Sequence, residues 1–426
     1  MSENNKNNNG PREQALSIAA GAVEDDDSSK TDVVAGDQPI EKPHRLWLWI
    51  GLFLVVVVVA VAIAIPVSIH LLNRTAESQP TIWPRTPEGL AGLIQSRLPS
   101  VSFDNTTSPE SQALMWMTEV DTVNHETLSD DQLVQRFAMT AIGYSINGLS
   151  NWFTALSECS WGSDQVVCNS LGEVTRIDAG WASLSGSIPV SIGLLTNIAR
   201  MILYSNALTG KIPSEVGGLT ALTELSLFSN TLTGSIPSEV GGLTRLTELW
   251  LSSNSLTGTI PPEMGGLTAL GYLSLYDNSL TGTIPSEMES LTALTELSLN
   301  SNSLTGSIPS EVEGLTALIV LNLDDNALTG SIPSEVGGLT ELIWLRLQSN
   351  ALTGSIPTEL GDLTRLTGLR LYNNILTGTI PTELGRLTRL MGLNLRSNAL
   401  TGTVPTGVCE VAPPIIDRGE IVCDCC

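Results

Sequence analysis

Histidine and aromatic residues are scarce in this chain of 426 residues, and charged residues make up only 15% of it. Aromatics account for 4%, and the histidines are His44, His70 and His125. Any core must therefore be built from aliphatic side chains, and catalysis or metal binding through histidine has few residues to use. The net charge of −24 repels phosphate backbones, so we expect no nucleic-acid partner.

Motifs for phosphate chemistry are missing as well. The sequence contains no Gly-x-Gly-x-x-Gly, no Gly-x-x-x-x-Gly-Lys, no His-Arg-Asp and no Asp-Phe-Gly. A serine triad after residue 72 would depend on His125 alone. We therefore expect that the protein is not an enzyme, and that it has no catalytic residues, no cofactor and no metal site.

One uncharged apolar run interrupts the N-terminal part of the chain. Residues 46–72 contain no Asp, Glu, Lys or Arg, and residues 46–65 are almost entirely aliphatic. About 20 such residues, rising 1.5 Å each, cross a hydrocarbon core of about 30 Å. The run predicts a single transmembrane helix over 46–72, with Trp47 and Trp49 at the membrane interface.

The residues on either side of this span predict its orientation. Lys42 and Arg45 precede the span, which favours a cytoplasmic N-terminus, and all six cysteines follow it. The polar residues 1–45 are expected to form a disordered cytoplasmic tail. The remainder is expected outside the cell at the plasma membrane, with Asn105 of the sequon Asn105-Thr106-Thr107 glycosylated.

The second half of the chain repeats with a period of 24. Proline recurs at this interval from Pro189 to Pro405, and asparagine from Asn206 to Asn398. One unit, starting at Leu222, reads Leu-x-x-Leu-x-Leu-x-x-Asn-x-Leu-Thr-Gly-x-Ile-Pro. A fixed period of this length predicts a solenoid, here of about ten units over residues 174–408. Leucines two residues apart point to one strand face and form its interior.

The repeated unit resembles the plant-type leucine-rich repeat. The resemblance implies an α/β solenoid, wound as a right-handed superhelix with a parallel sheet on its concave side. Residues 159–173 resemble the N-terminal cap of that class, which implies a Cys159–Cys168 disulfide. Residues 409–426 are expected to form a cysteine-rich C-terminal cap. Its four cysteines allow three full pairings, among which the sequence does not decide; Cys409–Cys423 is the preferred bridge, and a metal site is the alternative.

Residues 73–158 are expected to form a helical juxtamembrane region. Ser129 and Gln132 form a capping-box pattern that opens a helix running to Ile146, and residues 108–120 predict another. This region resembles the segment before the repeats in kinase-less membrane leucine-rich-repeat proteins of microalgae. A plant-type leucine-rich-repeat receptor kinase carries a cytoplasmic kinase domain, for which residues 1–45 are too few, so the kinase is not expected here.

Aromatic and arginine side chains gather on the predicted concave face. In each unit, the residues flanking the two inner leucines face solvent, and these positions hold much of the chain's aromatic content. Exposed aromatics bind peptides or stack on sugars, and neighbouring arginines bind a carboxylate or sulfate. The candidate ligand-binding residues are Tyr204, Phe228, Trp250, Tyr272, Tyr276, Trp344, Arg346, Arg370, Tyr372 and Arg396.

These observations predict a single-pass membrane recognition protein. Its concave face would bind an extracellular peptide, protein or glycan, and signalling would need a partner such as a co-receptor. A structural or adhesive surface protein is one alternative. A second is ice binding through paired threonines, such as Thr257 with Thr259 and Thr281 with Thr283, in rows that Lys211 interrupts.

Overall fold

The computed structural model describes most of the chain after residue 86. It covers residues 87–123, 125–149, 152–153, 157–162, 165–412, 415–416 and 421–422. The predicted tail at 1–45 and the predicted transmembrane helix at 46–72 lie outside these residues. Within them, no helix is both long and apolar enough to span a bilayer.

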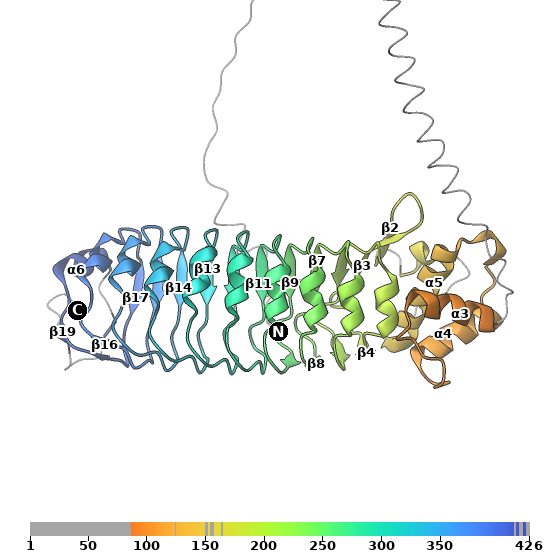
Figure 1. Ribbon diagram of the computed structural model, residues 1–426, viewed down its shortest axis with the longest axis horizontal. Helices are drawn as coiled ribbons and strands as arrows, with labels where there is room; N and C mark the ends of the chain where they lie inside the picture. The colour runs from red at the N-terminus through yellow and green to blue at the C-terminus, as the bar shows by residue number, and fades with distance from the viewer. Residues whose placement is uncertain are drawn as a thin grey trace, which may run out of the picture. The chain divides into compact units, whose positions relative to one another are not determined.

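A long parallel sheet runs along the solenoid (Figure 1). Its strands recur every 24 residues and pair in register, so that Leu225 lies opposite Leu249 and Leu273 opposite Leu297. β2 adds an antiparallel edge strand beside β3. The strands are β2 Val166–Cys168, β3 Val174–Asp178, β5 Arg200–Ile202, β7 Glu224–Ser226, β9 Glu248–Trp250, β11 Tyr272–Ser274, β12 Glu296–Ser298, β13 Val320–Asn322, β14 Trp344–Arg346, β15 Gly368–Arg370 and β17 Gly392–Asn394.

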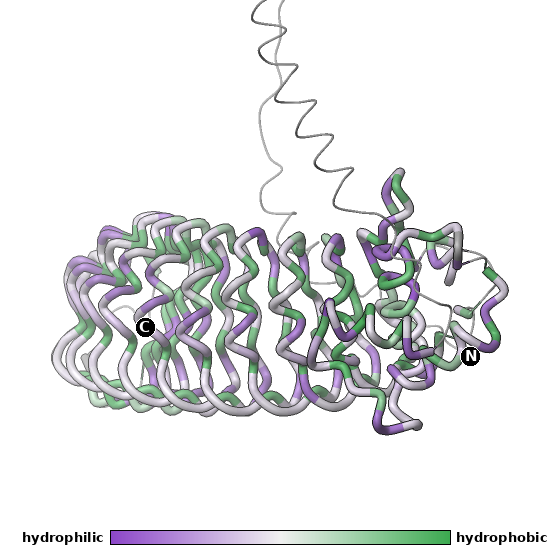
Figure 2. Tube along the Cα trace, turned by 45° about the vertical axis from the view of Figure 1, so that its right-hand side comes forward, coloured by the Kyte–Doolittle hydropathy of each residue, from purple (hydrophilic) through white to green (hydrophobic). Residues whose placement is uncertain are grey.

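The leucines at fixed positions of each unit form one continuous core. Leu222, Leu225, Leu227 and Leu232 are all fully buried, as are their counterparts in the following units. Because a single unit cannot cover its own leucines, neighbouring units must stack to bury them. Figure 2 shows the resulting arrangement, in which apolar and polar stretches return at the same place in successive coils.

Short 3₁₀ helices line the side opposite the sheet, and each begins directly after the repeated proline. In one of them, Gly241 lies so close to the next unit that an added Cβ would meet the carbonyl oxygen of Glu263 at 2.2 Å. The helices are η3 Val190–Leu194, η4 Ser214–Gly218, η5 Ser238–Gly242, η6 Pro262–Gly266, η7 Ser286–Ser290, η8 Ser310–Gly314, η9 Ser334–Gly338, η10 Thr358–Asp362 and η11 Thr382–Arg386.

Besides the parallel sheet and the 3₁₀ helices, short strands run along another edge of the solenoid. Most of them pair with a short strand of the neighbouring unit. Gly234, in β8, has a φ of +76°, a conformation that glycine adopts without strain. These strands are β1 Ile146–Asn147, β4 Ser185–Ser187, β6 Ala207–Thr209, β8 Thr233–Gly234, β10 Ser255–Leu256, β16 Thr377–Gly378, β18 Ala399–Leu400, β19 Gly402–Thr403 and β20 Ile421–Val422.

The repeated asparagine joins each unit to the one before it. Asn278 Oδ1 accepts a hydrogen bond from the Leu256 amide at 3.0 Å, and its Nδ2 donates to the carbonyls of Leu251 and Leu275, both at 3.1 Å. The same pattern recurs from Asn206 to Asn398. The asparagines therefore bond to backbone groups of their own unit and of the preceding unit, and not to one another.

The residue before each of these asparagines adopts the left-handed conformation. Its φ lies between +51° and +55° in every unit, although glycine occupies none of these positions. Ser, Asp and Asn tolerate this conformation because their short polar side chains bond locally. The residues are Ser205, Ser229, Ser253, Asp277, Ser301, Asp325, Ser349, Asn373 and Ser397.

Helices pack against the end of the solenoid where the repeats begin (Figure 1). They are α3 Pro87–Arg97, α4 Pro109–Glu119 and α5 Asp130–Ser145, with the short turns η1 His125–Thr127 and η2 Glu158–Ser160. The predicted capping box is present at the start of α5. The Ser129 amide donates to Gln132 Oε1 at 2.9 Å, and the Gln132 amide donates to Ser129 Oγ at 3.2 Å.

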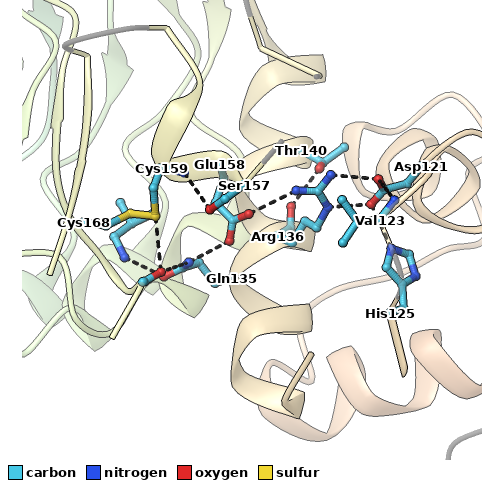
Figure 3. A network of polar contacts seen from close by, with 12 residues as sticks. Asp121, Val123, His125, Gln135, Arg136, Thr140, Ser157, Glu158, Cys159 and Cys168 are labelled. Carbon is cyan, nitrogen blue, oxygen red and sulfur yellow. Dashed lines mark hydrogen bonds and ion pairs between the residues drawn. A yellow bond between two sulfur atoms is a disulfide. The ribbon is translucent and has the colours of Figure 1, made fainter. Parts of the chain in front are cut away.

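A buried arginine on α5 connects this helical region to the start of the repeats (Figure 3). The Arg136 side chain is 1% exposed and contacts Asp121 at 2.5 Å and Glu158 at 3.1 Å. Its guanidinium also lies 5.3 Å from the Trp116 ring centroid and 5.2 Å from that of Trp161. Because opposite charges meet and aromatic rings enclose them, this cluster holds the helices together.

The neighbouring Gln135 extends the same network to the first repeat. Its Nε2 donates to Glu158 at 2.7 Å, and its Oε1 accepts from the Val174 amide at 2.6 Å. Next to Glu158, the disulfide expected from the cap resemblance joins Cys159 to Cys168. The helical region, the disulfide loop and β3 are thus fixed to one another by polar contacts and one covalent bond.

The C-terminal end is closed by α6 Thr406–Val411, which packs on η11. Val408 and Ala412 are buried there against the last repeat. Cys409 is disulfide-bonded, but its preferred partner Cys423 lies outside the described residues. The pairing of the C-terminal cysteines therefore remains a prediction.

We predict that Asn278→Ala lowers the free energy of unfolding by about 1–3 kcal/mol. The substitution leaves the Leu256 amide without its partner and removes one of the two asparagine donors to the Leu251 carbonyl, the other being Asn254. Urea denaturation followed by circular dichroism measures the change. Ser279→Ala, at the adjacent exposed position, is the control and should stay within about 0.5 kcal/mol. Equal losses in both variants would contradict the role of the asparagine.

We also predict that the contact between Asp121 and Arg136 makes the protein sensitive to acid. Burial raises the pKa of Asp121, but the hydrogen bonds from His125 and Arg136 outweigh burial and hold that pKa far below its usual value. A carboxyl whose pKa is depressed by folding stabilises the fold above its unfolded pKa of about 4. This stabilisation is lost progressively as the pH falls below that value.

Arg136→Met tests this interpretation. At pH 7 the variant should lose about 3–5 kcal/mol of stability, because the Asp121 charge stays buried without its main partner. The loss should shrink at pH 3, where the unfolded carboxyl is already largely protonated. Arg97→Met removes the exposed Arg97–Asp131 pair and should cost less than about 1 kcal/mol at either pH. Denaturation curves at the two pH values measure both variants, and a pH-independent loss in Arg136→Met would refute the prediction.

Candidate functional site

Three columns of side chains run along the concave face of the parallel sheet. Each unit contributes one residue to each column, at the positions flanking its inner leucines, as with Tyr272, Ser274 and Tyr276 around Leu273 and Leu275. We name these the first, second and third columns. Because the strands pair in register, residues 24 apart in the sequence are neighbours in a column, at about 4.8 Å.

The aromatic residues near the start of the repeats contact one another. Tyr204 and Phe228 are neighbours in the third column and stack with ring centroids 4.6 Å apart and an angle of 3°. Trp181, which the sequence analysis did not select, meets Tyr204 edge to face at 6.4 Å and is 71% exposed. The Tyr204 ring also lies over Gly180, where an added Cβ would approach it to 2.8 Å.

A second aromatic pair lies in the middle of the sheet. Trp250 and Tyr272 stack at 5.9 Å with an angle of 19°, although they belong to different columns. Tyr276 lies in the third column of the same unit as Tyr272. Four of the predicted aromatic residues therefore form two stacked pairs, and the faces that the paired rings turn toward each other are not open to a ligand.

The arginines cluster toward the end of the sheet, around Trp344. Arg346 and Arg370 lie opposite each other in the second column, as predicted. Their guanidinium carbons lie 5.0 Å and 6.0 Å from the Trp344 ring centroid. Arg396 stands in the third column, 5.2 Å from the Tyr372 ring. Cation–π contacts thus hold the arginines beside aromatic surfaces.

Ion pairs distinguish the two ends of the concave face. Near its start, Arg176 contacts Asp178, and Arg200 Nε lies 2.6 Å from Glu224. Among the described residues, no carboxylate lies within 4.0 Å of the three arginines Arg346, Arg370 and Arg396. These three keep their charges available to a ligand.

Acidic residues also act on these arginines. The charges of Asp324 and Glu296 both act on Arg346, so the region has mixed charge. Burial raises the pKa of Asp324 and of Glu296, and it lowers the pKa of Arg346. These three charged groups are therefore partly desolvated, which strengthens their electrostatic interaction with a ligand.

Three polar residues that the sequence analysis did not select complete this region. Asn322, Asp324 and Gln348 are 8%, 9% and 4% exposed, and they adjoin Arg346 in the second and third columns. We name Asn322, Asp324, Arg346 and Gln348 the polar block. The indication in the sequence was the run of amide and acidic residues at these column positions, where the units from Ser226 to Tyr276 hold only serine or aromatic residues.

A different surface carries a row of threonines on the edge formed by the short strands. Nine exposed threonines recur every 24 residues, from Thr209 to Thr401. Their backbone amides donate to the glycine carbonyl of the preceding unit, as from Thr305 to Gly282 at 2.7 Å. Several hydroxyls donate to the same carbonyls, including Thr209 at 3.0 Å and Thr305 at 3.2 Å. The row is regular in its backbone contacts, which recur in successive units.

The predicted glycosylation residue lies on the surface of the helical region. Asn105 is exposed between α3 and α4, in the loop before Ser108. Its Oδ1 accepts hydrogen bonds from the amide of Thr107 at 3.1 Å and from its hydroxyl at 2.8 Å. The side chain is accessible to modification, and glycosylation itself remains a prediction.

Comparison with protein families identifies the repeats. A family model described as Leucine rich repeat matches residues 244–304 and 293–352. A second, described as Leucine Rich Repeat, matches residues 221–243 and 365–387. Together with the register of the parallel sheet and the repeated asparagine, these matches define the class of the solenoid.

Solved structures of plant proteins share this fold. The ectodomain of the Arabidopsis thaliana receptor kinase GASSHO1/SCHENGEN3, in complex with CASPARIAN STRIP INTEGRITY FACTOR 2, is 37% identical with a TM-score of 0.63, covering 65% of this chain and 34% of that one. The PEPR1–AtPEP1 complex is 28% identical with a TM-score of 0.60, covering 66% and 44%. A plant ice-binding protein is 27% identical with a TM-score of 0.55, covering 68% and 96%.

The chain is a plant-type leucine-rich-repeat protein. It spans less than half of the length of the two receptor ectodomains and nearly all of the ice-binding protein. Its repeats share the fold of these plant proteins.

Proposed function

We propose that this protein is a single-pass membrane recognition protein whose concave face binds an extracellular peptide, protein or glycan. The observation that carries the proposal is the concentration of unpaired arginines, aromatic rings and buried polar groups in the concave columns from Glu296 to Arg396. Groups of this kind dominate the binding energy of protein interfaces. These arginines, rings and polar groups are not part of the leucine core.

The related structures support binding on the same kind of scaffold. Two of the receptor ectodomains are complexes with CASPARIAN STRIP INTEGRITY FACTOR 2 and with AtPEP1. A further one, the Arabidopsis receptor kinase HAESA, is a complex with the peptide hormone IDA and the co-receptor SERK1, at 28% identity and a TM-score of 0.50. By analogy, this protein would bind its ligand without chemical change and signal, if it signals, through a partner.

We predict that ligand binding depends on the concave arginines. The full-length protein in detergent is applied to an array of peptides and glycans, and each ligand that binds is tested again with Arg346→Ala/Arg370→Ala. Affinity should fall by about tenfold or more, because both guanidinium groups lie free beside Trp344. Glu311→Ala/Glu335→Ala, on η8 and η9 of the opposite side, is the matched double variant and should bind like the wild type.

The reverse result would exclude the concave face. If the Glu311→Ala/Glu335→Ala protein lost binding while Arg346→Ala/Arg370→Ala retained it, the ligand would bind the side that carries the 3₁₀ helices. The recognition function would then need another surface.

A second function, ice binding, is favoured by one specific observation. The exposed threonines from Thr209 to Thr401 form an uninterrupted row with repeated backbone and hydroxyl contacts. A regular array of hydroxyl and methyl groups at strand spacing is a surface that ordered water can match. The plant ice-binding protein supports this second candidate, since the chain covers 96% of its length. Lys211 stands in the adjoining row and interrupts only that one.

The ice-binding candidate predicts thermal hysteresis by the full-length protein. Thr281→Tyr/Thr329→Tyr should abolish that activity, because two bulky rings break the row at exposed positions. Arg346→Ala/Arg370→Ala should leave it unchanged, since those residues lie on the sheet. Nanolitre osmometry measures the effect. Absence of thermal hysteresis in the wild type would eliminate this function and leave the concave-face proposal standing.

A further inference from the structure

Four polar atoms of the polar block are buried without a hydrogen-bond partner. They are Asn322 Oδ1, Asp324 Oδ1, Arg346 Nε and Gln348 Oε1. Eight buried side-chain atoms of the described residues lack a partner, so half of them lie in these four residues. The four come from two neighbouring units, because Asn322 pairs in register with Arg346. Such concentration in one place is not expected of a purely structural surface.

Leaving these atoms unpaired carries an energetic cost. A buried donor or acceptor without a partner destabilises a protein, because it has lost its hydrogen bonds to water and gained none in return. Elsewhere in the second column, the Ser298 hydroxyl donates to Glu296, and Ser274 Oγ is a single unpaired atom outside the block. Buried polar groups that weaken a fold are characteristic of functional sites. The polar block is therefore best explained by a ligand that supplies the missing partners.

The atoms in the block specify what such a ligand must carry. Three of them, on Asn322, Asp324 and Gln348, accept hydrogen bonds, and Nε of Arg346 donates one. A hydroxyl group both donates and accepts, so neighbouring hydroxyls on one molecule match this set. A carboxylate ligand would leave the three acceptors unpaired, and an ammonium group would leave the Arg346 donor unpaired.

The charges around the block favour a neutral ligand. Arg346 and Arg370 contribute two positive charges, and Asp324 and Glu296 contribute two negative ones. An anion would gain from the arginines and lose to the carboxylates, and a cation the reverse. Asp325 also acts on Asp324, so an ion of either sign would meet repelling as well as attracting groups here.

An aromatic surface borders the block. The Trp344 ring lies across the next strand at Gly368, where an added Cβ would come within 2.2 Å of it. One unit further along the first column, nothing lies within 4 Å of the Cβ position of Gly392. A sugar ring has hydroxyls on its rim and an apolar C–H face, and it can meet the polar block and an indole edge together.

We propose that the polar block, together with Trp344, is a subsite for a neutral saccharide residue of the ligand. The inference rests on the proposed concave-face function and names the chemistry recognised at one part of that face. The sugar comes either from an oligosaccharide or from a glycosylated peptide, because the ring hydroxyls are the same in both.

Binding of defined oligosaccharides to the full-length protein tests the proposal. The probes are the neutral cellohexaose, xylohexaose, mannohexaose and laminarihexaose, with acidic hexagalacturonate and cationic chitosan hexamer as charged counterparts. The second arm uses serine peptides that carry one glucose, xylose or mannose, beside the bare peptides. We expect at least one neutral sugar to bind, free or on a peptide, and the arm that binds identifies its source.

Gln348→Met is the critical variant, because methionine keeps the length of the side chain and removes the unpaired Oε1. Affinity for the neutral sugar should fall by about tenfold. Ser252→Ala, four units earlier in the third column, is the control and should change affinity by less than about twofold. Asp324→Asn should also weaken binding, since it replaces an acceptor by a donor.

Thermal unfolding of the same variant gives a second readout. If Oε1 is unpaired in the free protein, Gln348→Met should raise the melting temperature while it weakens binding. A lowered melting temperature would show that Gln348 is held by the fold itself, and would overturn the proposal. Isothermal calorimetry and differential scanning calorimetry supply the two measurements.

The remaining outcomes overturn the saccharide subsite without touching the proposed function. Binding of the bare peptides alone, weakened by Arg346→Ala/Arg370→Ala, would leave the concave face as the binding surface and exclude a sugar. Binding of only the charged hexamers, or of no sugar at millimolar concentration, would exclude a neutral saccharide. If no concave-face variant changed the binding of any ligand, both the saccharide subsite and the proposed concave-face function would be rejected.

Discussion

The stacking of identical units through buried asparagines is the constraint on which the rest of the structure depends. Asn278 bonds to backbone groups of its own unit and of the preceding one, so its position fixes the distance between them. The leucines alone would tolerate sliding, because apolar contacts have no preferred direction. Hydrogen bonds do have one, and their repetition from Asn206 to Asn398 holds every strand in the same register.

Constant register has a consequence for function. It places residues 24 apart side by side, so each surface of the solenoid is a set of columns whose content the sequence can vary without disturbing the core. The concave columns vary from unit to unit, with stacked rings at Tyr204 and Phe228 and mixed charge around Arg346. The threonine row does not vary. Variable columns suit recognition of one particular ligand, and an invariant row suits a repetitive partner.

The sequence predicted those parts of the structure that depend on periodic spacing. Leu225 and Leu227, the prolines and the asparagines each recur at one interval, and a periodic core is a direct result. The Ser129–Gln132 capping box was also readable, because its two residues are three apart. Arg136 was not, since its partners Asp121 and Glu158 lie 15 and 22 residues away on other segments. Only the packing of the helices brings these charges together.

The polar block shows why the candidate site was only partly predictable. Arg346 and Arg370 were placed correctly, because a column is a matter of register. Whether the polar atoms in a column have hydrogen-bond partners depends on the three-dimensional packing. Spacing in the sequence therefore could not predict that Gln348 Oε1 has no partner. Asp324 and Glu296 act on Arg346 with the opposite charge, so the region is of mixed charge. From its arginines alone, the sequence predicted a site for an anion such as a carboxylate or sulfate. With the neighbouring carboxylates included, the region is better suited to a neutral polar group.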